Sequence, residues 1–533
     1  MTRTRMRAYA AGAAALLTTT SLAACGGTSS DGDGDGEAAG YVSGGSYVAA
    51  ISSDPGHLIP MTGVSLAARA MVAYAYESLA AVTKDGEFKP WLAASWEETG
   101  TSVSYTLKEG ITCADGTPFT AQAAADNINY HADPEHATFY YGSQVNEEVT
   151  ATADGDTLTV ARSRNDPLLL ANTATVEMVC PSGLADPDSL QDATAGTGLF
   201  QLDSATPGST YTYTRRTDYT WGPDGVTSTT EGLPDTVEVR VVTDETTAAN
   251  LLVAKDINAA VITGASRDRL DAMELATITQ RNPVGEMLFN EKADRVTADP
   301  LVRRALVLAL DRAAVGDVVS NGTAIDSRSL IVTAPFVCVA GGPKWQLPDT
   351  DLAEAERLLD QAGWTAGADG RRTKDGAPLT VKFIYDAATA THAPAAELVQ
   401  QTWDQLGITT ELSGNNAAAW SEQLFQTFDW DTGFVQVAPG SPPVLASFFA
   451  AATPDQGGNN FMFVDNPAYE ALIAQAAEAT PEATCDLWQQ AEAELVDRTD
   501  VFPLADNELT TYLSGAELTA DVFHSPAEIR MLG

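Results

Sequence analysis

The chain has 533 residues, with 30 Lys and Arg against 72 Asp and Glu, so its formal net charge is −42. This length exceeds that of one ordinary domain, and a hydrophobic content of 44% excludes global disorder. The charge argues against a nucleic-acid-binding protein, because phosphate neutralisation requires Lys and Arg, and against adsorption to an anionic membrane surface. The composition therefore predicts a large, acidic, multi-domain soluble protein.

The N-terminus has the pattern of a secretory signal. Residues 1–24 contain three Arg and no acid, then an Ala-rich apolar stretch too short to span a membrane. The tetrapeptide Leu22–Cys25 resembles the bacterial lipobox, in which the Cys is lipidated and becomes the mature N-terminus. Ordinary signal cleavage beside an incidental Cys is the alternative. We expect a signal peptide over 1–24 and a lipid on Cys25 that anchors the protein to the outer face of the cytoplasmic membrane.

Residues 25–40 follow as a predicted linker. Apart from Cys25, this stretch consists mostly of Gly, Ser, Ala and acidic residues. Such a composition cannot build a core, so we expect a flexible acidic tether.

Four further cysteines occur in the body of the chain. They are Cys113, Cys180, Cys338 and Cys485. An even number in an exported protein suggests two disulfides, for which three pairings are possible. Because the sequence has no C-x-x-C motif or Cys/His cluster, we expect no metal site at these cysteines.

Short strands are predicted in the first half of the chain. In residues 102–108, Val103, Tyr105 and Leu107 alternate with Ser and Thr, which is typical of a half-buried strand. Similar β patterns occur at 155–162, 210–215 and 236–242.

Helices become frequent after residue 298. Asp299 and Pro300 provide an N-cap and a proline at the first helical position, and apolar residues at helical spacing continue to Ala313. A second helix is expected over 350–362, where Gly363 ends it.

A strand–helix–strand unit follows in the C-terminal half. The strand 380–385, the helix 394–406 and the strand 408–412 form a predicted βαβ unit, which implies a parallel sheet. Further helices are expected over 467–479 and 481–498. The fold class is therefore α/β, with a β-rich first part.

Motifs that carry catalysis are missing from the sequence. It has no H-E-x-x-H, G-x-S-x-G, Walker A or G-x-G-x-x-G pattern. Its five His are scattered, and His131 and His136 flank a helix-breaking Asp-Pro pair. We therefore predict a protein that is not an enzyme and that uses no cofactor. The many acids leave a glycosidase-like carboxylate pair open, so a secreted hydrolase is the distant alternative.

Aromatic residues crowd residues 420–463. Most are expected to form the core of a lobe, and a few are expected to line a cleft, where aromatic walls with some polar groups bind ligands.

A series of motifs resembles one protein family. In order, they are Tyr76–Leu79 (YESL), Pro90–Trp96 (PWLAASW), Tyr105–Gly110, Asp115–Ala121 (DGTPFTA), Gly196–Phe200 (GTGLF), Asp299–Arg312 (DPLVRRALVLALDR) and Ala353–Trp364 (AEAERLLDQAGW). The series resembles the family 5 extracytoplasmic solute-binding proteins, which are the oligopeptide-, dipeptide- and nickel-binding receptors of ABC importers. The resemblance spans nearly all of residues 45–515.

The resemblance implies a two-lobed clam-shell of the type II periplasmic-binding-protein class with an extra domain, in which helices flank mixed sheets. The implied domains are domain I (41–77, 191–288 and 504–533), domain II (78–190) and domain III (289–503). The chain would cross the hinge twice. With these lobes we favour the pairings Cys113–Cys180 and Cys338–Cys485, because each pair then lies inside one lobe.

The implied function is capture of a peptide or similar-sized organic solute. The family closes its lobes around the ligand and delivers it to ABC permease subunits in the membrane. We expect a monomer with no nucleic-acid partner.

Family ligand positions carry over unevenly onto this chain. They fall on Val64, Ser65 and Leu66 in the loop after the first strand, on Tyr140 and on Trp420. Further candidates are Phe434, Gln436, Asn459, Asn460, Asp506 and Asn507.

One departure from the family pattern concerns the solute. The family acid that clamps a peptide amine falls on Ala438, and a buried ammonium needs a paired carboxylate. Either Asp506 or Glu508 replaces that acid, or the solute has no free amine. A nickel receptor is disfavoured, since no His occurs in residues 393–523.

Overall fold

The computed structural model describes residues 40–533 except 64, 84–85, 143, 334, 388 and 520–524. The predicted signal peptide, Cys25 and nearly all of the predicted linker therefore lie outside the described residues. By its contacts the chain divides into two units, residues 1–40 and residues 41–533. For description we call residues 41–283 with 506–533 the N-terminal lobe, and residues 286–503 the C-terminal lobe. The predicted domain limits within them stay predictions.

The main sheet of the N-terminal lobe has seven strands in the order β12-β21-β11-β1-β10-β9-β8. They are β1 (Ser46–Ile51), β8 (Phe200–Thr206), β9 (Thr210–Arg215), β10 (Thr236–Val241), β11 (Ala259–Ile262), β12 (Ala276–Pro283) and β21 (Asp506–Leu513). β1 runs parallel to β10 and β11, while the other pairs are antiparallel. The sheet is thus mixed, and alternate residues such as Tyr211 and Tyr213 point into the core.

A second, antiparallel sheet of this lobe has the order β4-β5-β7-β6. Its strands are β4 (Ala93–Glu98), β5 (Ser102–Leu107), β6 (Val149–Asp154) and β7 (Thr157–Arg162). Val103, Tyr105 and Leu107 are buried, as the alternation in the sequence predicts. Helix α2 (Ala121–Ala132) contacts β6 and β7 and begins at Thr120, whose hydroxyl accepts from the Ala123 amide.

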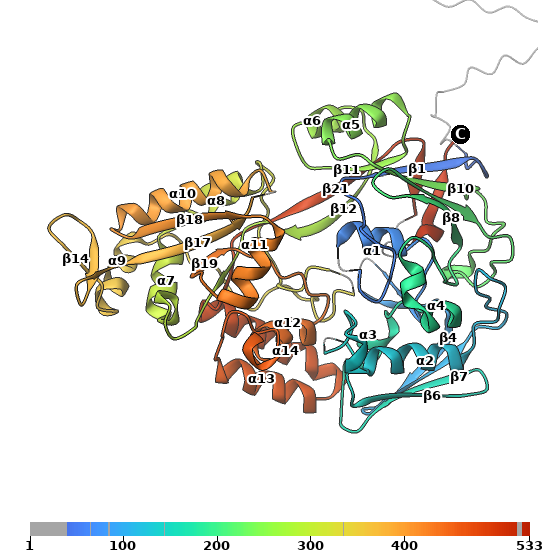
Figure 1. Ribbon diagram of the computed structural model, residues 1–533, viewed down its shortest axis with the longest axis horizontal. Helices are drawn as coiled ribbons and strands as arrows, with labels where there is room; N and C mark the ends of the chain where they lie inside the picture. The colour runs from blue at the N-terminus through green and yellow to red at the C-terminus, as the bar shows by residue number, and fades with distance from the viewer. Residues whose placement is uncertain are drawn as a thin grey trace, which may run out of the picture. The chain divides into compact units, whose positions relative to one another are not determined.

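Shorter elements complete the N-terminal lobe (Figure 1). They are α1 (Leu66–Val72), β2 (Ala80–Val82), β3 (Phe88–Pro90), α3 (Leu169–Ala174), α4 (Pro181–Ala185), α5 (Glu245–Ala254), α6 (Arg267–Asp271), β22 (Ala516–Leu518) and β23 (Ile529–Met531).

The C-terminal lobe is built on a five-stranded sheet in the order β18-β17-β19-β13-β20. Its strands are β13 (Glu286–Phe289), β17 (Thr380–Asp386), β18 (Thr409–Asn415), β19 (Thr432–Phe434) and β20 (Val501–Pro503). β17 and β18 pair in parallel across α10 (His392–Gln405), which is the predicted βαβ unit. A small sheet of β14 (Thr365–Ala366), β15 (Arg372–Lys374) and β16 (Ala377–Pro378) lies apart from it.

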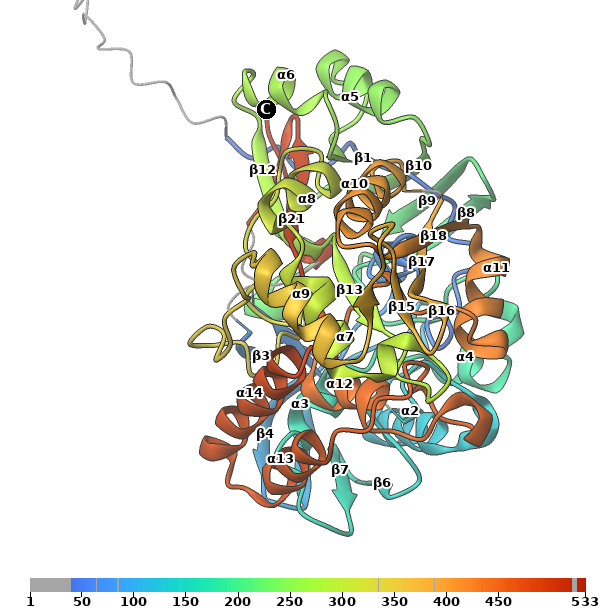
Figure 2. The same cartoon turned by 90° about the vertical axis from the view of Figure 1, so that its left-hand side faces the viewer.

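Two layers of helices cover the five-stranded sheet. Met287 and Phe289 share a core with α7 (Pro300–Leu308), α8 (Arg312–Val319), α9 (Leu352–Gln361) and α10. Leu288, which points the other way, packs with residues of α12 (Pro442–Phe449), α13 (Pro467–Glu478) and α14 (Pro481–Asp497). Figure 2 shows α8 and α10 near the top of this lobe and α12, α13 and α14 towards its lower end. Helix α11 (Ala417–Glu422) also belongs to this lobe.

The helix expected to run from residue 300 to Ala313 is two helices. α7 ends at Leu308, and α8 begins at Asp311, whose carboxylate accepts a 3.0 Å hydrogen bond from the Ala314 amide. An Asp at this place competes for backbone amides and starts a new helix. The apolar spacing continues across the break, which is why it did not reveal the break.

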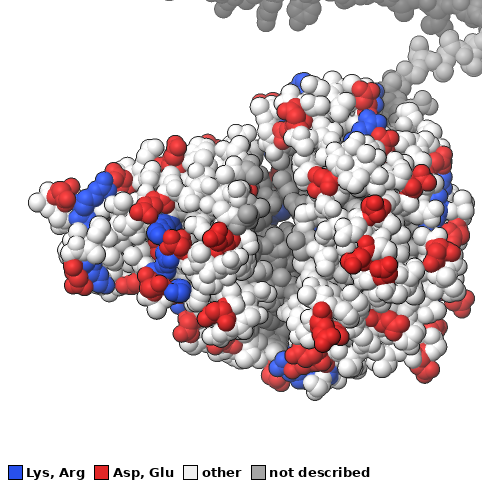
Figure 3. Space-filling model, viewed as in Figure 1, with Lys and Arg blue, Asp and Glu red and all other residues white. Residues whose placement is uncertain are grey.

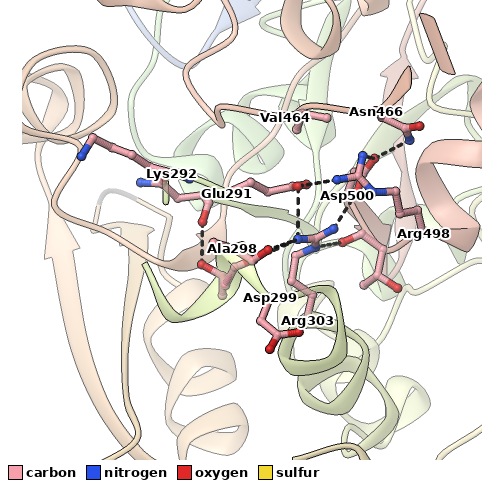
Figure 4. Close-up of polar contacts among 12 residues, drawn as sticks. Glu291, Lys292, Ala298, Asp299, Arg303, Val464, Asn466, Arg498 and Asp500 are labelled. Atoms are coloured by element: carbon pink, nitrogen blue, oxygen red, sulfur yellow. Dashed lines mark hydrogen bonds and ion pairs between the residues drawn. The ribbon is translucent and has the colours of Figure 1, made fainter. Parts of the chain in front are cut away.

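The motif that begins at Asp299 supplies a buried ion network inside the C-terminal lobe (Figure 4). The guanidinium of Arg303, which is fully buried, lies 3.2 Å from Glu291 and 3.0 Å from Asp500. Arg498 contacts the same two acids at 2.8 and 3.4 Å, so two guanidinium groups face two carboxyl groups, and burial together with Asp500 raises the pKa of Glu291 to about 9. Asn466 adds a 2.8 Å hydrogen bond to Asp500. This network ties β13, α7 and the end of α14 together.

A different buried acid anchors the N-terminal lobe. Both oxygens of Glu77 accept two hydrogen bonds each, at 2.5–2.9 Å, from Trp91, Tyr219, Thr197 and Trp221. Burial raises the pKa of Glu77, and these hydrogen bonds act in the opposite direction. The motif residues YESL, PWLAASW and GTGLF thus meet in the interior.

One disulfide lies in each lobe. Cys113 is bonded to Cys180, and Cys338 to Cys485. This is the pairing favoured from the sequence with the lobes that the family resemblance implies.

Two antiparallel strands join the lobes. β12 and β21 leave the seven-stranded sheet and continue as β13 and β20 in the five-stranded sheet (Figure 1). At the crossing, the amides of Val284 and Gly285 donate to the carbonyl of Ala505 at 3.1 and 3.3 Å. A Cβ on Gly285 would lie 3.1 Å from side-chain atoms of Leu504 and Val319, so the crossing is tightly packed. This two-strand connection is the natural hinge of the fold.

Candidate functional site

A groove lies between the two lobes. Figure 3 shows it as a hollow with few charged side chains along it, while the charged groups on the rest of the visible face are mostly acidic. Figure 1 places α1 and α3 on the edge of the N-terminal lobe that faces α11 and α12 of the C-terminal lobe. A groove between hinged lobes is a common place for a small-molecule site.

The lobes also touch each other directly. Leu168 and Ala171 of the N-terminal lobe pack with Val337 and Trp488 of the C-terminal lobe. The side-chain amide of Asn165 donates to the carbonyls of residues 477 and 479 at 2.8 and 3.3 Å. These contacts close one end of the groove.

The N-terminal wall carries an ion pair. Arg69 of α1 forms a salt bridge with Glu177, and its guanidinium lies 5.9 Å from the centre of the Phe139 ring. The side chain of Arg69 is 29% exposed, yet burial lowers its pKa to about 10. Phe139 is 44% exposed, and its amide donates to the carbonyl of Met61. The wall therefore combines a cation with an exposed aromatic ring.

The predicted loop residues lie at the start of α1. Val64 is outside the described residues, and of Leu66 only the helical backbone is described. Ser65 is exposed, and its hydroxyl caps α1 by accepting from the Ala68 amide at 3.1 Å.

Tyr140 lies just behind this wall. It is 2% exposed, its ring contacts His131 at 4.7 Å, and its hydroxyl accepts from the Glu177 amide at 3.5 Å. His131 is fully buried and neither ring nitrogen has a partner among the described residues. Burial lowers its pKa to about 3, so the imidazole is neutral at pH 7.

The C-terminal wall is neutral where the sequence predicted contacts. Trp420 on α11 is half-buried and packs at the edge of the core under α12. Gln436 and Ala438 are exposed, whereas Val435 and Val437, which alternate with them, are buried. This segment follows β19, so it leaves the sheet beside the strand ends of the βαβ unit.

Three other candidates are placed differently. Phe434 is 1% exposed and packs against Phe383 in the core, with ring centres 5.0 Å apart. Asn460 is buried and exchanges two hydrogen bonds with the backbone of Val464. Phe434 and Asn460 thus hold the lobe together, whereas Asn459 is exposed.

Asp506 and Asn507 lie at the hinge. Asp506 is 1% exposed and forms a 2.8 Å ion pair with Arg281, although burial raises its pKa. Asn507 accepts a 3.3 Å hydrogen bond from Asn282 on the neighbouring strand. The carboxylate that we considered as a replacement clamp is therefore already paired, while Glu508 is exposed.

Glu286 is a hinge acid that the sequence analysis missed. It is 2% exposed; one oxygen accepts from the Val437 amide at 3.1 Å, and the other has no partner among the described residues. Burial raises its pKa to about 8, and the nearby charges of Asp506 and Glu492 act in the same direction. Glu286 is an acid within the apolar run around β13, and this position could have indicated a buried carboxyl group.

Arg69 and Glu177 were also missed. Arg69 is the single Lys or Arg between residues 8 and 83, and this isolation in an acidic chain could have drawn attention to it. Glu177 comes close to Arg69 only through the fold, since it lies 108 positions further along the chain (177 − 69).

The described residues contain neither a metal-binding cluster nor a membrane-spanning helix. Among the described residues, no group of three or more His, Cys, Asp or Glu is arranged to hold a metal ion. In the same part of the chain, no helix combines the length and apolar character needed to cross a membrane.

Comparison with known proteins establishes the family. The model of the bacterial extracellular solute-binding proteins, family 5, matches residues 87–459. The chain belongs to this family. Protein XP55 of Streptomyces lividans is 26% identical to this family 5 protein over 501 residues, which cover 89% of this chain and 88% of that protein. The glutathione-binding protein GsiB of Escherichia coli (strain K12) is 23% identical over 491 residues, covering 87% and 89%.

A solved family structure supports the fold. NikA from Brucella suis in complex with Fe(III)-EDTA superimposes with a TM-score of 0.76 at 23% identity, covering 91% of this chain and 100% of that chain. The predicted two-lobed α/β fold is thereby confirmed for this family 5 protein.

Proposed function

We propose that this chain is a lipid-anchored receptor of an ABC importer, not an enzyme, and that it captures an organic solute in the interlobe groove. The observation that carries the proposal is the groove between two lobes joined by only two strands. A solute that contacts both walls favours the closed arrangement, and this differential affinity drives closure. The closed receptor then delivers its solute to permease subunits as a monomer.

The proposed contacts come from both walls. From the N-terminal lobe they are Val64, Ser65, Leu66 and Tyr140, and from the C-terminal lobe Trp420, Gln436 and Asn459. The chemical character of this set supports the proposal, because aromatic groups with a few polar ones suit a small organic ligand.

The solute is proposed to be a peptide or a molecule of similar size. One relative is named for glutathione binding and a structural neighbour holds Fe(III)-EDTA, so the family frame accepts both peptides and other polar solutes. Ala438 supplies no carboxylate for a peptide amine, and Asp506 is paired with Arg281. These two facts favour a solute without a free α-amine as the second candidate.

Calorimetry distinguishes the two candidates. Free di- to pentapeptides and their N-acetylated forms are titrated into the protein at the same ionic strength. Heat and a rise in Tm with the free peptides support the peptide receptor. Binding by the acetylated forms alone supports the second candidate, whereas no heat with either set contradicts the peptide proposal.

The lipid anchor is proposed from Leu22–Cys25 and the acidic linker. Cys25→Ala should move the protein from the membrane fraction to the soluble fraction of the native host, while Ser29→Ala should leave it membrane-bound. Unchanged membrane attachment of the Cys25→Ala protein would contradict the anchor.

The secreted hydrolase is the distant alternative. Turnover of any ester, glycoside or peptide by the purified protein would support it and would count against a receptor.

A further inference from the structure

The N-terminal wall of the groove offers a cation in an unusual setting. Arg69 lies on α1, one of the two helices that Figure 1 shows along the edge facing the C-terminal lobe. Its guanidinium is 29% exposed, but its pKa is lowered by burial as for an interior group. A side chain that is open to solvent and yet surrounded by protein is typical of a concave surface.

The contacts of Arg69 engage both terminal nitrogens of the guanidinium. One terminal nitrogen pairs with Glu177 and the other lies 3.4 Å from the Pro60 carbonyl. Within the described part of the chain, the Nε atom donates to no acceptor. The Phe139 ring supports the guanidinium from the side at 5.9 Å. The side chain is thus oriented by its partners while the Nε–H donor stays available.

We propose that Arg69, positioned by Glu177 and flanked by Phe139, binds a carboxylate of the solute. This inference rests on the proposed receptor function and names a chemical feature of the solute. A guanidinium N–H forms a charge-assisted hydrogen bond with a carboxylate, and a partly desolvated site strengthens such a bond. The exposed Phe139 ring suits an apolar group next to that carboxylate.

The opposing wall is consistent with an acidic solute. Gln436 and Ala438, which are exposed after β19, carry no charge. This segment therefore adds no negative charge that would repel an acidic solute. Among the described residues, Glu177 is the acid paired with the guanidinium, and it positions the guanidinium while repelling an incoming anion.

Glu177 provides a test with a defined sign. Glu177→Gln keeps a side chain of the same size beside Arg69 and removes the negative charge. If Arg69 binds a carboxylate, this variant should bind it about threefold more tightly or better, because the repulsion is gone. If Arg69 and Glu177 are only a structural pair, the variant should not gain affinity.

The experiment is a thermal-shift screen of the full chain followed by calorimetry. The probes are N-acetylated di- and tripeptides and aromatic and aliphatic carboxylic acids, each beside its primary amide. The proteins are the wild type, Arg69→Gln, Glu177→Gln and the control Arg164→Gln, whose side chain is 61% exposed on the surface.

The expected result has three parts. At least one acid raises the Tm of the wild type and of Arg164→Gln, while its amide does not. Arg69→Gln loses about tenfold or more of the affinity, and Glu177→Gln gains affinity. If Arg69→Gln does not fold, the Glu177→Gln affinity and the acid–amide pairs decide the question.

Other results overturn the inference. They are equal binding of an acid and its amide, unchanged affinity in Arg69→Gln, weaker binding by Glu177→Gln, or no acid that binds. A non-acidic solute that raises the Tm would reject the carboxylate site and leave the receptor proposal standing, so the two failures are distinguishable.

Discussion

Buried acids in the interior of the lobes and at the hinge between the lobes differ in their hydrogen-bond and ion-pair partners. In the C-terminal lobe, Glu291 and Asp500 face two arginines, and in the N-terminal lobe Glu77 accepts four hydrogen bonds from neutral donors. At the hinge, Glu286 accepts a single backbone hydrogen bond and one of its oxygens has no described partner. Glu291 also has one oxygen without a described partner, but it faces two guanidinium groups, whereas Glu286 forms no ion pair among the described residues.

This difference separates two roles of the sequence. The residues that carry the family resemblance, such as Glu77, Thr197 and Arg303, lie inside the lobes and hold the frame. The residues that we propose to contact or select the solute, Arg69, Gln436 and Ala438, lie outside those motifs. We therefore expect stability and solute choice to depend on different parts of the chain.

The ion network of the C-terminal lobe should show the largest effect. Arg303→Met leaves Glu291 and Asp500 with one cation between them, so we expect a loss of about 3–5 kcal/mol in the free energy of unfolding. Chemical denaturation measures it. Arg304→Met, the adjacent residue on α7, is the control and should cost less than about 1 kcal/mol. Equal losses in both variants would contradict a paired interior.

Glu286 should make stability depend on pH. Its pKa of about 8 in the folded state lies above the usual 4.5, so the folded protein binds the extra proton. The stabilisation is present at acidic pH and is lost as the pH rises through 8. We expect the wild type to lose about 2–3 kcal/mol relative to Glu286→Gln between pH 6 and pH 9.

The measurement is urea denaturation of both proteins across this pH range. Glu286→Gln mimics the protonated acid and serves as the reference for the titration of Asp506 and Glu492 nearby. Parallel curves for the two proteins would show that the hinge acid is compensated like the interior ones.

Glu77 should respond less strongly than Arg303. Glu77→Gln turns one acceptor oxygen into a donor that faces Thr197 and Trp221 or Trp91 and Tyr219. We expect a loss of about 1–2 kcal/mol. Glu97→Gln, an exposed position on β4, should stay within about 0.5 kcal/mol of the wild type. A Glu77→Gln protein as stable as the wild type would contradict the claim that the hydrogen bonds of Glu77 stabilise the N-terminal lobe.

The smallest effect is expected at the contact between the lobes. Asn165→Ala removes two hydrogen bonds to carbonyls of the C-terminal lobe, with a cost below about 1 kcal/mol in global stability. The population of open protein should rise, which small-angle scattering detects as a larger radius of gyration without solute. An unchanged radius together with unchanged solute affinity would show that Asn165 does not influence closure.

Much of the fold could be predicted from local patterns. Alternation in Val103, Tyr105 and Leu107 identified β5, and the strand–helix–strand order identified the parallel pair β17 and β18. Local patterns act over a few residues, so they cannot show breaks that depend on capping, as at Asp311 between α7 and α8.

The site was harder to predict, because it depends on contacts between distant segments. Phe434 and Asn460 are residue types that often contact ligands. In this fold, however, Phe434 packs in the core and Asn460 forms hydrogen bonds with the backbone of Val464. Arg69 meets Glu177 and Phe139 only after α1, α2 and α3 have assembled. No spacing rule within one segment could have joined them.

Native mass spectrometry of protein purified without refolding tests the receptor proposal most directly. A closed receptor retains its solute, so we predict a non-covalent adduct of a few hundred daltons that collisional activation removes. The released molecule should restore the Tm of solute-free protein when it is added back. A protein that shows only its own mass, and whose Tm no peptide or organic acid raises, would contradict the proposal that the groove binds a solute.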